Sequence, residues 1–259
     1  MKRALVTGAA KRLGRAMALS LAQQGYDVAV HYASSGDEAD NTVSDIRAMG
    51  RAATALQADL LDETQVTGLI ARASKALGGP LTVLVNNASI FEHDTLGTAT
   101  RTSWDRHMES NLRAPFVLTQ EFAAQVPDPE HDTKGEPIAE GLVVNMIDQR
   151  VRKLTPEFMS YTLAKSALWT LTQTAAQALA PRVRVNGIGP GPTVRGIRQT
   201  VEGFERQRAA TLLGRGPDET DISQALSYLL TARSVTGQLI CVDGGQHLGW
   251  QTPDVLGVE

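Results

Sequence analysis

The chain has 259 residues, which suits one large α/β domain or two small ones. Its formal net charge of -3 provides no basic field for nucleic acid, and no apolar run is long enough to span a membrane. One cysteine, Cys241, and five scattered histidines predict neither a disulfide nor a metal site, and without a signal segment we expect a cytoplasmic protein.

The amino-terminal stretch predicts a strand, a glycine loop and a helix. Residues 4–7 are apolar, residues 8–14 contain the glycines, and residues 15–24 carry apolar side chains at helical spacing. Glycine lets the backbone approach a pyrophosphate, and the helix N-terminus offers free N–H groups. Gly8 and Gly14 lack the common Gly-x-Gly-x-x-Gly spacing, so the glycines alone also fit an ordinary tight turn.

The residues that come after the second predicted strand, 27–32, indicate the cofactor. An NAD site places a carboxylate about 20 residues past the glycine loop, to bind the ribose 2′-hydroxyl. Here residues 33–36 include two serines, and the first acid is Asp37. Lys11 and Arg12 in the glycine loop suit a 2′-phosphate, or else they are solvated loop charges. We therefore expect NADPH rather than NADH.

The next elements continue the alternation of strand and helix. Helices are predicted over residues 36–49 and 62–77, and strands over 52–58 and 81–85. Asp59 comes directly after a strand, where it could meet the adenine amino group or cap the next helix, and both alternatives stay open.

Small polar residues 86–89 come directly after a strand, at the edge of the sheet where doubly wound folds bind ligands. The helix predicted over 101–125 carries Asn111, which is unfavourable inside a helix and so indicates either a kink or a site role. Residues 127–140 are charged and rich in proline, which predicts an exposed surface insertion.

The remaining elements alternate in the same way. They are a strand over 141–146, a helix over 155–180, a strand over 183–188, a turn over 189–193, a helix over 220–230 and a strand over 238–242. Residues 194–215 are expected to form a mobile lid. The alternation predicts an α/β fold over residues 1–259, a single Rossmann-type, doubly wound parallel sheet of about seven strands with helices on both faces.

Tyr161 and Lys165 are four residues apart on the predicted helix and so lie on the same face. A neighbouring ammonium favours the phenolate and lowers the tyrosine pKa of about 10 toward neutrality. The pair could therefore act as a general acid or base, although such a spacing also occurs by chance on exposed helices.

Taken together, the motifs resemble the short-chain dehydrogenase/reductase family over essentially the whole chain. They occur in the family's order: Thr7 to Gly14, Asp59, Asn86 to Ala88, Asn111, Tyr161 to Lys165, Asn186, and Pro190-Gly191. The resemblance implies that Tyr161 donates a proton, that Lys165 lowers its pKa and binds the nicotinamide ribose, and that Asn111 holds a water in a relay ending at Lys165. It also implies a small-molecule substrate and a homotetramer.

The same resemblance implies a set of cofactor contacts, with Thr193 at the cofactor amide. The expected NADPH-binding residues are Thr7, Gly8, Lys11, Arg12, Leu13, Gly14, His31, Ser34, Ser35, Asp59, Leu60, Asn87, Ala88, Tyr161, Lys165, Pro190, Gly191 and Thr193.

One position departs from the family. Most members carry serine thirteen residues before the tyrosine, whereas this chain has Asp148. An ionised carboxylate beside a developing alkoxide would raise the barrier to ketone reduction and also raise the pKa of Tyr161. A C=N substrate reverses the sign, because its nitrogen is protonated as hydride arrives. A carboxyl that only caps a helix or loop is the alternative for Asp148.

Pteridine reductases and the related dihydromonapterin or dihydrofolate reductases carry Asp at this point. The chain resembles them also in Thr7 to Arg15 and in Asn86 to Phe91, but it lacks their arginine after His31-Tyr32. The resemblance implies that the substrate is bound by Arg12, Ser89, Phe91, Asp148 and Tyr161, with Phe91 stacking on the pterin unless it simply packs in the core.

The sequence therefore predicts NADPH-dependent reduction of a dihydropterin to a tetrahydropterin. Two other functions stay open. One is a carbonyl reductase for a 3-oxoacyl thioester, a sugar or a xenobiotic ketone, and the other is a non-catalytic dinucleotide-binding sensor.

Overall fold

A seven-stranded parallel sheet forms the centre of the computed structural model, which describes residues 2–196, 199–252 and 255. Its strand order is β3-β2-β1-β4-β7-β8-β9. The strands are β1 (Arg3–Val6), β2 (Asp27–Tyr32), β3 (Ala53–Gln57), β4 (Val83–Asn86), β7 (Gly141–Met146), β8 (Val183–Pro190) and β9 (Leu239–Val242). The predicted fold class is thus confirmed, with every pair of strands parallel.

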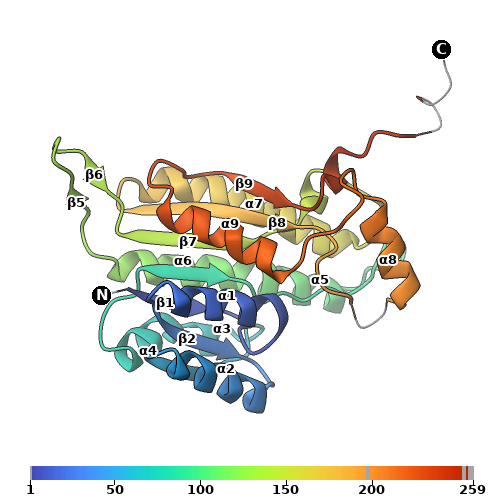
Figure 1. Cartoon of the computed structure of the whole chain (residues 1–259). Coiled ribbons are helices and arrows are strands. Elements are labelled where there is room, and N and C mark those ends of the chain that lie inside the picture. Colours follow the sequence, from blue (N-terminus) through green and yellow to red (C-terminus); the bar gives the residue numbers. More distant parts are fainter. Residues whose placement is uncertain (1, 197–198, 253–254, 256–259) are drawn as a thin grey trace.

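Helices cover both faces of this sheet (Figure 1). On one face α1 (Arg12–Gln23), α2 (Gly36–Ala48) and α9 (Glu219–Thr231) bury residues such as Met17, Ile46 and Leu226. The helices of the other face share a second core that includes Leu69, Phe122 and Ala176; they are α4 (Leu69–Ala76), α6 (Ala114–Gln125) and α7 (Met159–Leu179). Because both faces are covered, the central strands are continuous apolar runs rather than alternating ones.

The strand order places a switch point at β1. From β1 the chain builds outward to β3 and then returns to add β4 on the other side. The connections that leave β1 and β4 in opposite directions open a crevice at the carboxyl edge of the sheet, which is where such folds bind ligands. The glycine loop, residues 86–89 and Asp148 all lie just beyond strands that end at this edge.

Three predicted helices differ in detail from the structure. The segment 101–125 divides into α5 (Arg101–Met108), a π-helix η1 (Glu109–Arg113) and α6, so Asn111 lies in a π-helix. Gly68, with φ of 82°, separates α3 (Glu63–Val66) from α4, because that conformation ends a helix. The third, α7, begins only at Met159, after Phe158 in a left-handed conformation.

Residues 127–140 form more than an irregular insertion. They include an antiparallel hairpin of β5 (Glu130–His131) and β6 (Pro137–Ile138), which projects at the end of the molecule opposite α8 (Val201–Ala209) (Figure 1). The predicted lid, residues 194–215, contains α8, which has no buried residue, and positions 197–198 lie outside the described residues.

In the described part of the chain, every helix is too short or too polar to cross a membrane.

Candidate active site

Asp148 and Tyr161 are in direct contact at the carboxyl edge of the sheet. Asp148 lies just after β7, and Tyr161 lies in the first turn of α7. The Tyr161 hydroxyl donates to Asp148 Oδ2 at 2.8 Å, and Asp148 Oδ1 accepts from the Arg150 backbone N–H at 2.8 Å. The carboxyl therefore caps the 3-10 helix η2 (Gln149–Val151) and also contacts the tyrosine. Burial raises the pKa of Asp148, which leaves this carboxyl easier to protonate than an exposed one.

Of the two opposing effects expected on the Tyr161 pKa, lowering by Lys165 and raising by Asp148, the raising effect prevails in the structure. Burial and the negative charge of Asp148 raise the pKa of Tyr161 well above its ordinary value, against smaller opposing effects of Arg150 and Ser89. A net lowering of the Tyr161 pKa by Lys165 is therefore not what this arrangement produces. Burial lowers the pKa of Lys165 to about 8, and its ammonium donates to the Met146 carbonyl at 2.7 Å. The phenol is thus protonated at neutral pH and holds a proton it can give.

Asn111 contacts a backbone segment rather than the reacting groups. Its Oδ1 accepts from the Ile90 N–H at 2.9 Å, and its Nδ2 donates to the Ile90 carbonyl at 2.8 Å. Both side-chain atoms are therefore committed to one residue's backbone, and the expected relay water would need another holding atom. Asn111 lies in the π-helix η1, and π-helices commonly occur at functional sites.

Phe91 lies beside Tyr161 and is 50% exposed, which contradicts the alternative that it is a core residue. Its ring meets the Tyr161 ring edge-on, with centroids 4.7 Å apart at 70°. It also stacks on the Phe158 ring at 4.2 Å and 8°. The Arg150 guanidinium lies over the Phe158 ring, 5.1 Å from its centroid. Neither Phe158 nor Arg150 was expected from the sequence; an aromatic residue three positions before Tyr161 was the only available signal.

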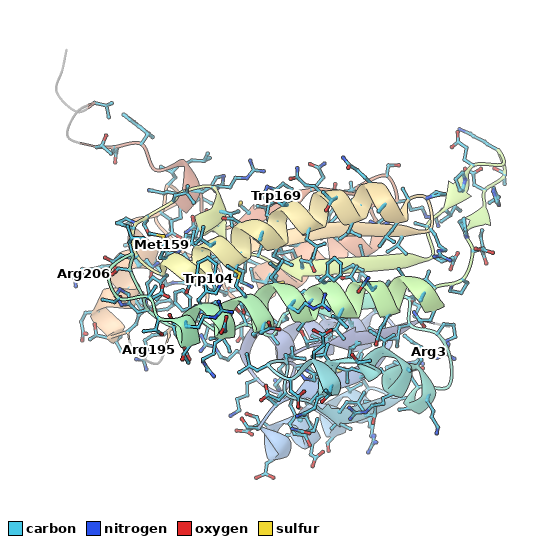
Figure 2. The ribbon with its side chains drawn as sticks, turned by 180° about the vertical axis from the view of Figure 1, so that it is seen from behind. Arg3, Trp104, Met159, Trp169, Arg195 and Arg206 are labelled. Atoms are coloured by element: carbon cyan, nitrogen blue, oxygen red, sulfur yellow. The ribbon has the colours of Figure 1, made fainter. Side chains whose placement is uncertain are left out.

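Ser89, a further residue of the expected substrate site, lies at the same edge. Ser89 is exposed in the segment that also carries Phe91, and it precedes Ile90, whose carbonyl accepts its hydroxyl at 3.4 Å. Met159, Trp104, Arg195 and Arg206 lie together at this end of the molecule, far from Arg3 (Figure 2).

The glycine loop is held tightly against the connection after β4. A Cβ added at Gly14 would lie 2.2 Å from the Gly8 carbonyl oxygen, and Gly8 itself has φ of 62°. The Asn87 amide donates to the Thr7 and Gly8 carbonyls at 2.8 and 3.2 Å. Thr7 Oγ1 accepts from the Asn87 and Ala88 N–H groups, both at 2.9 Å. Only glycine fits at these two positions, so the loop has the close backbone packing that a phosphate site needs.

His31 supports this loop from beneath and is itself buried. Its Nδ1 accepts from the Gly8 N–H at 3.1 Å, and its Nε2 contacts the Ala58 carbonyl at 3.0 Å. Since one nitrogen accepts and the other must donate, the ring is neutral with its proton on Nε2. Burial lowers the pKa of His31 to about 4, in agreement with that state. His31 therefore shapes the loop through Gly8.

The two cations of the glycine loop have partners of their own. Lys11 Nζ lies 2.5 Å from Glu38 Oε1 on α2. Arg12, which has a left-handed φ of 52°, donates to the Val194 and Arg195 carbonyls at 3.0 and 3.3 Å. Lys11 is thus an ion-pair partner rather than a freely solvated charge, and Arg12 joins the glycine loop to the start of the predicted lid.

The remaining expected cofactor residues lie around the same crevice. Ser34 is exposed, and the Ser35 side chain, at the N-cap of α2, forms no capping hydrogen bond within the described chain. Asp59 Oδ1 accepts from the Leu61 N–H at 3.0 Å, whereas Asp62 caps α3, so the idea that Asp59 caps that helix is wrong.

Leu60 is buried, and Leu13 is half-buried against the core. Pro190 is the last residue of β8. After it, the Gly191 N–H donates to the Val242 carbonyl at 2.9 Å, and Thr193 Oγ1 donates to the Gly191 carbonyl at 3.1 Å. A metal-binding group of three or more His, Cys, Asp or Glu side chains is absent from the residues that the structure describes.

Comparisons with known proteins agree with this geometry. A family model described as enoyl-(acyl carrier protein) reductase matches residues 8–247. The chain is 32% identical over 252 residues to the 3-oxoacyl-(acyl-carrier-protein) reductase FabG of Staphylococcus aureus, an alignment that covers 95% of this chain and 98% of that protein.

Two solved structures are more similar in sequence. The FolM alternative dihydrofolate reductase 1 of Brucella suis, in complex with NADP, is 46% identical with a TM-score of 0.90, and the match covers 98% of both chains. The corresponding protein of Brucella canis, complexed with NADP, is 44% identical with a TM-score of 0.89, again over 98% of both chains.

Proposed function

Because this chain belongs to the short-chain dehydrogenase/reductase family, we propose that it is an NADPH-dependent enzyme that reduces a dihydropterin to a tetrahydropterin. The observation that carries the proposal is the hydrogen bond between the Tyr161 hydroxyl and the Asp148 carboxyl, next to the half-exposed ring of Phe91.

The residues around the glycine loop fit a phosphorylated dinucleotide. Gly8 and Gly14 leave no room for a side chain, so a pyrophosphate can approach the backbone at the N-terminus of α1. Within the described chain the Ser35 hydroxyl does not cap α2, and no acid lies between the end of β2 and Asp37. When bound, NADPH would supply the hydride. We expect a lower KM for NADPH than for NADH; the reverse order would contradict this assignment.

The charge at Asp148 favours reduction of a C=N bond over reduction of a ketone. When a ketone accepts hydride, its oxygen becomes an alkoxide, and a neighbouring carboxylate would raise that barrier. When a ring imine is reduced, its nitrogen takes up a proton, which a carboxylate stabilises or a carboxylic acid donates. The hydroxyl oxygen of Tyr161 lies 2.8 Å from Asp148 Oδ2, so either group can deliver the proton they share.

Phe91 and Ser89 would bind the ring of the substrate. The exposed part of the Phe91 ring offers a flat apolar surface beside Tyr161, and the Ser89 hydroxyl lies on the same exposed side of the segment. Flat heterocycles stack on such rings with about 0.5–1.5 kcal/mol beyond area burial. The similarity to two FolM alternative dihydrofolate reductases supports this class of substrate.

A spectrophotometric screen of NADPH oxidation tests the proposal directly. The panel contains dihydrobiopterin, dihydrofolate and a set of ketones that includes a 3-oxoacyl thioester. We expect turnover of at least one dihydropterin, with kcat/KM above that of every ketone. Turnover of ketones alone would overturn the proposal.

The second candidate function is reduction of a ketone, which the similarity to a 3-oxoacyl-(acyl-carrier-protein) reductase favours. Tyr161 and Lys165 would serve either reaction, whereas Asp148 distinguishes them. The ketone arm of the same screen decides between the two, with a dinucleotide-binding sensor indicated by tight NADPH binding and no turnover.

We also propose that the enzyme is a homotetramer in the cytoplasm. Large apolar side chains are exposed on three neighbouring helices, namely Trp104 on α5, Phe116 on α6 and Leu163 on α7. Such a surface is typical of an interface between subunits. Light scattering on a sizing column would give a mass four times that of the chain, and a monomeric mass would contradict this part.

A further inference from the structure

The segment from Ser89 to Asp94 lies beside the candidate active site, and the exposure of its side chains alternates along the chain. Its odd-numbered residues are exposed, whereas its even-numbered residues are buried or half-buried. Side chains of an extended chain point alternately to opposite sides, which produces this pattern. The outward side carries Ser89 and Phe91, and the inward side carries three anchors that reach other parts of the fold.

The last of these anchors, Asp94, caps the helix that carries Tyr161. The first N–H groups of a helix have no partner inside the helix, and at α7 the N-cap residue, Phe158, has a side chain that cannot accept a hydrogen bond. The Met159 N–H donates to the Asp94 carbonyl at 3.1 Å, and the Ser160 N–H donates to Asp94 Oδ1 at 3.1 Å. Asp94, from a distant segment, thus accepts one hydrogen bond through its backbone carbonyl and one through its carboxylate, which also supplies a favourable charge at this N-terminus.

His107 on α5 joins the middle of the segment to the same carboxylate. Its Nε2 accepts from the Glu92 N–H at 3.1 Å, so its proton lies on Nδ1, which donates to Ser160 Oγ at 2.7 Å. Ser160 Oγ in turn donates to Asp94 Oδ2 in a short contact. The side chains of His107, Ser160 and Asp94 are buried, and the hydrogen bonds run in one direction from Glu92 to Asp94.

Two polar neighbours complete this network. Ser103 Oγ on α5 donates to Asp94 Oδ2 at 3.1 Å, and the first anchor, Ile90, is held through its backbone by Asn111. Burial would raise the pKa of Asp94, but the hydrogen bonds from Ser160 and Ser103 outweigh it, and the pKa lies below its ordinary value. The carboxylate is therefore ionised at neutral pH.

We propose that Asp94 and His107 are positioning residues that fix the Phe91 ring relative to Tyr161, and so set how a flat substrate ring stacked on Phe91 is placed against the Tyr161 hydroxyl. Phe91 precedes Glu92, which His107 holds, and Tyr161 comes directly after Ser160, which Asp94 holds. The two rings are 4.7 Å apart at their centroids. Buried polar groups are costly to desolvate, and directional hydrogen bonds define geometry more sharply than apolar contacts do. The inference rests on the proposed function for the identity of the ring.

The substitution Asp94→Asn tests this role with little change in volume. The new amide keeps one oxygen for the Ser160 N–H but turns an NH2 group toward the Ser160 and Ser103 hydroxyls, so the chain from His107 is broken. We expect KM for the dihydropterin to rise and kcat to fall, so that kcat/KM decreases about tenfold or more. Small misplacements of reacting groups lower the rate of reaction strongly. The Kd for NADPH, measured by fluorescence, should change much less than kcat/KM does, since the glycine loop is untouched.

Two control variants separate positioning from general stability. Leu168→Ala removes a buried side chain lower on α7, and Asp105→Asn removes an exposed charge on α5 that pairs with Arg101. Both should leave kcat/KM unchanged, even where Leu168→Ala lowers Tm as much as Asp94→Asn does. If Leu168→Ala and Asp94→Asn reduce kcat/KM equally at equal Tm loss, the network is only structural and the proposal is overturned.

Hydrogen exchange gives a readout that needs no substrate. We expect faster exchange in peptides covering 89–95 and 158–163 of Asp94→Asn, and not in those of either control; unchanged exchange would overturn the proposal. If the wild-type enzyme reduces ketones and no dihydropterin, the proposed function fails. The same variants then report the position of Tyr161 through kcat with the ketone.

Discussion

At the scale of single residues, the contact between Asp148 and Tyr161 determines what the site can do. The sequence indicated both residues, because an acid stands at an unusual position before a Tyr-x-x-x-Lys pair. It could not give the direction of the Tyr161 pKa, since that depends on burial and on which partner the hydroxyl meets. Lys165 points its ammonium at the Met146 carbonyl, a contact that no spacing in the sequence indicates.

Replacing Asp148 by serine should separate the two candidate reactions. Asp148→Ser removes the carboxyl but keeps a hydroxyl near Tyr161, the group that suits a developing alkoxide. We expect dihydropterin turnover to fall by about 10²-fold or more while the Kd for NADPH is kept. Steady-state rates with both substrate classes measure this, and equal dihydropterin rates for the two proteins would contradict the role of Asp148.

Removing the phenolic proton should slow whichever reaction the enzyme performs. Tyr161→Phe keeps the ring that packs against Phe91 and deletes only the hydroxyl. General acid catalysis contributes about 10²–10⁴-fold, so kcat should fall by that order with little change in KM. The Tyr228→Phe variant, on an exposed face of α9, is the matched control and should be unaffected. An unchanged kcat in Tyr161→Phe would show that another group donates the proton.

At the scale of elements, the strands were predictable and several helix ends were not. Central strands of a parallel sheet are apolar throughout, and that pattern is visible in the sequence. The division of segment 62–77 at Gly68 and the late start of α7 depend on contacts with other segments, such as the cap that Asp94 provides. Asp94, His107 and Phe158 were missed for the same reason, because their partners are far away in the sequence.

The glycine loop should lose affinity for NADPH if a single methyl group is added at Gly14. In Gly14→Ala the new Cβ would be placed 2.2 Å from the Gly8 carbonyl oxygen and 2.6 Å from Asn87 Nδ2, so the backbone must move. We expect NADPH affinity to fall by at least about tenfold, because the N–H groups that face the phosphates move with the loop. Gly97→Ala is the control, since nothing lies within 4 Å of its added Cβ in the described chain. Equal affinities in the two variants, measured by calorimetry, would contradict this account.

At the scale of the whole molecule, two buried neutral histidines, His31 and His107, make the free energy of unfolding depend on pH in the acidic range. Burial lowers the pKa of His31 to about 4 and lowers that of His107, and each ring accepts a backbone N–H that a protonated ring could not. A histidine whose folded pKa is lowered contributes full stability above its unfolded pKa, and that stability is lost as the pH falls.

The free energy of unfolding should therefore decrease as the pH drops from about 6.5 toward 4. For His31 alone the loss is about 2 kcal/mol at pH 5 and about 3 kcal/mol below pH 4. Denaturant melts at pH 7 and pH 5 measure it. In His31→Asn the side-chain oxygen can still accept from the Gly8 N–H but the side chain does not titrate, so the difference between the two pH values should shrink. An identical difference in both proteins would exclude His31 as the source.

The hairpin of β5 and β6 has a practical consequence. It projects from the end of the molecule opposite α8, and its turn around Lys134 and Gly135 is exposed (Figure 1). Exposed hairpin tips tolerate added chain well. A fluorescent reporter or an affinity tag inserted between those two positions would leave catalysis intact. An inserted tag would also allow the enzyme to be immobilised on a surface with the end that carries α8 facing the solution.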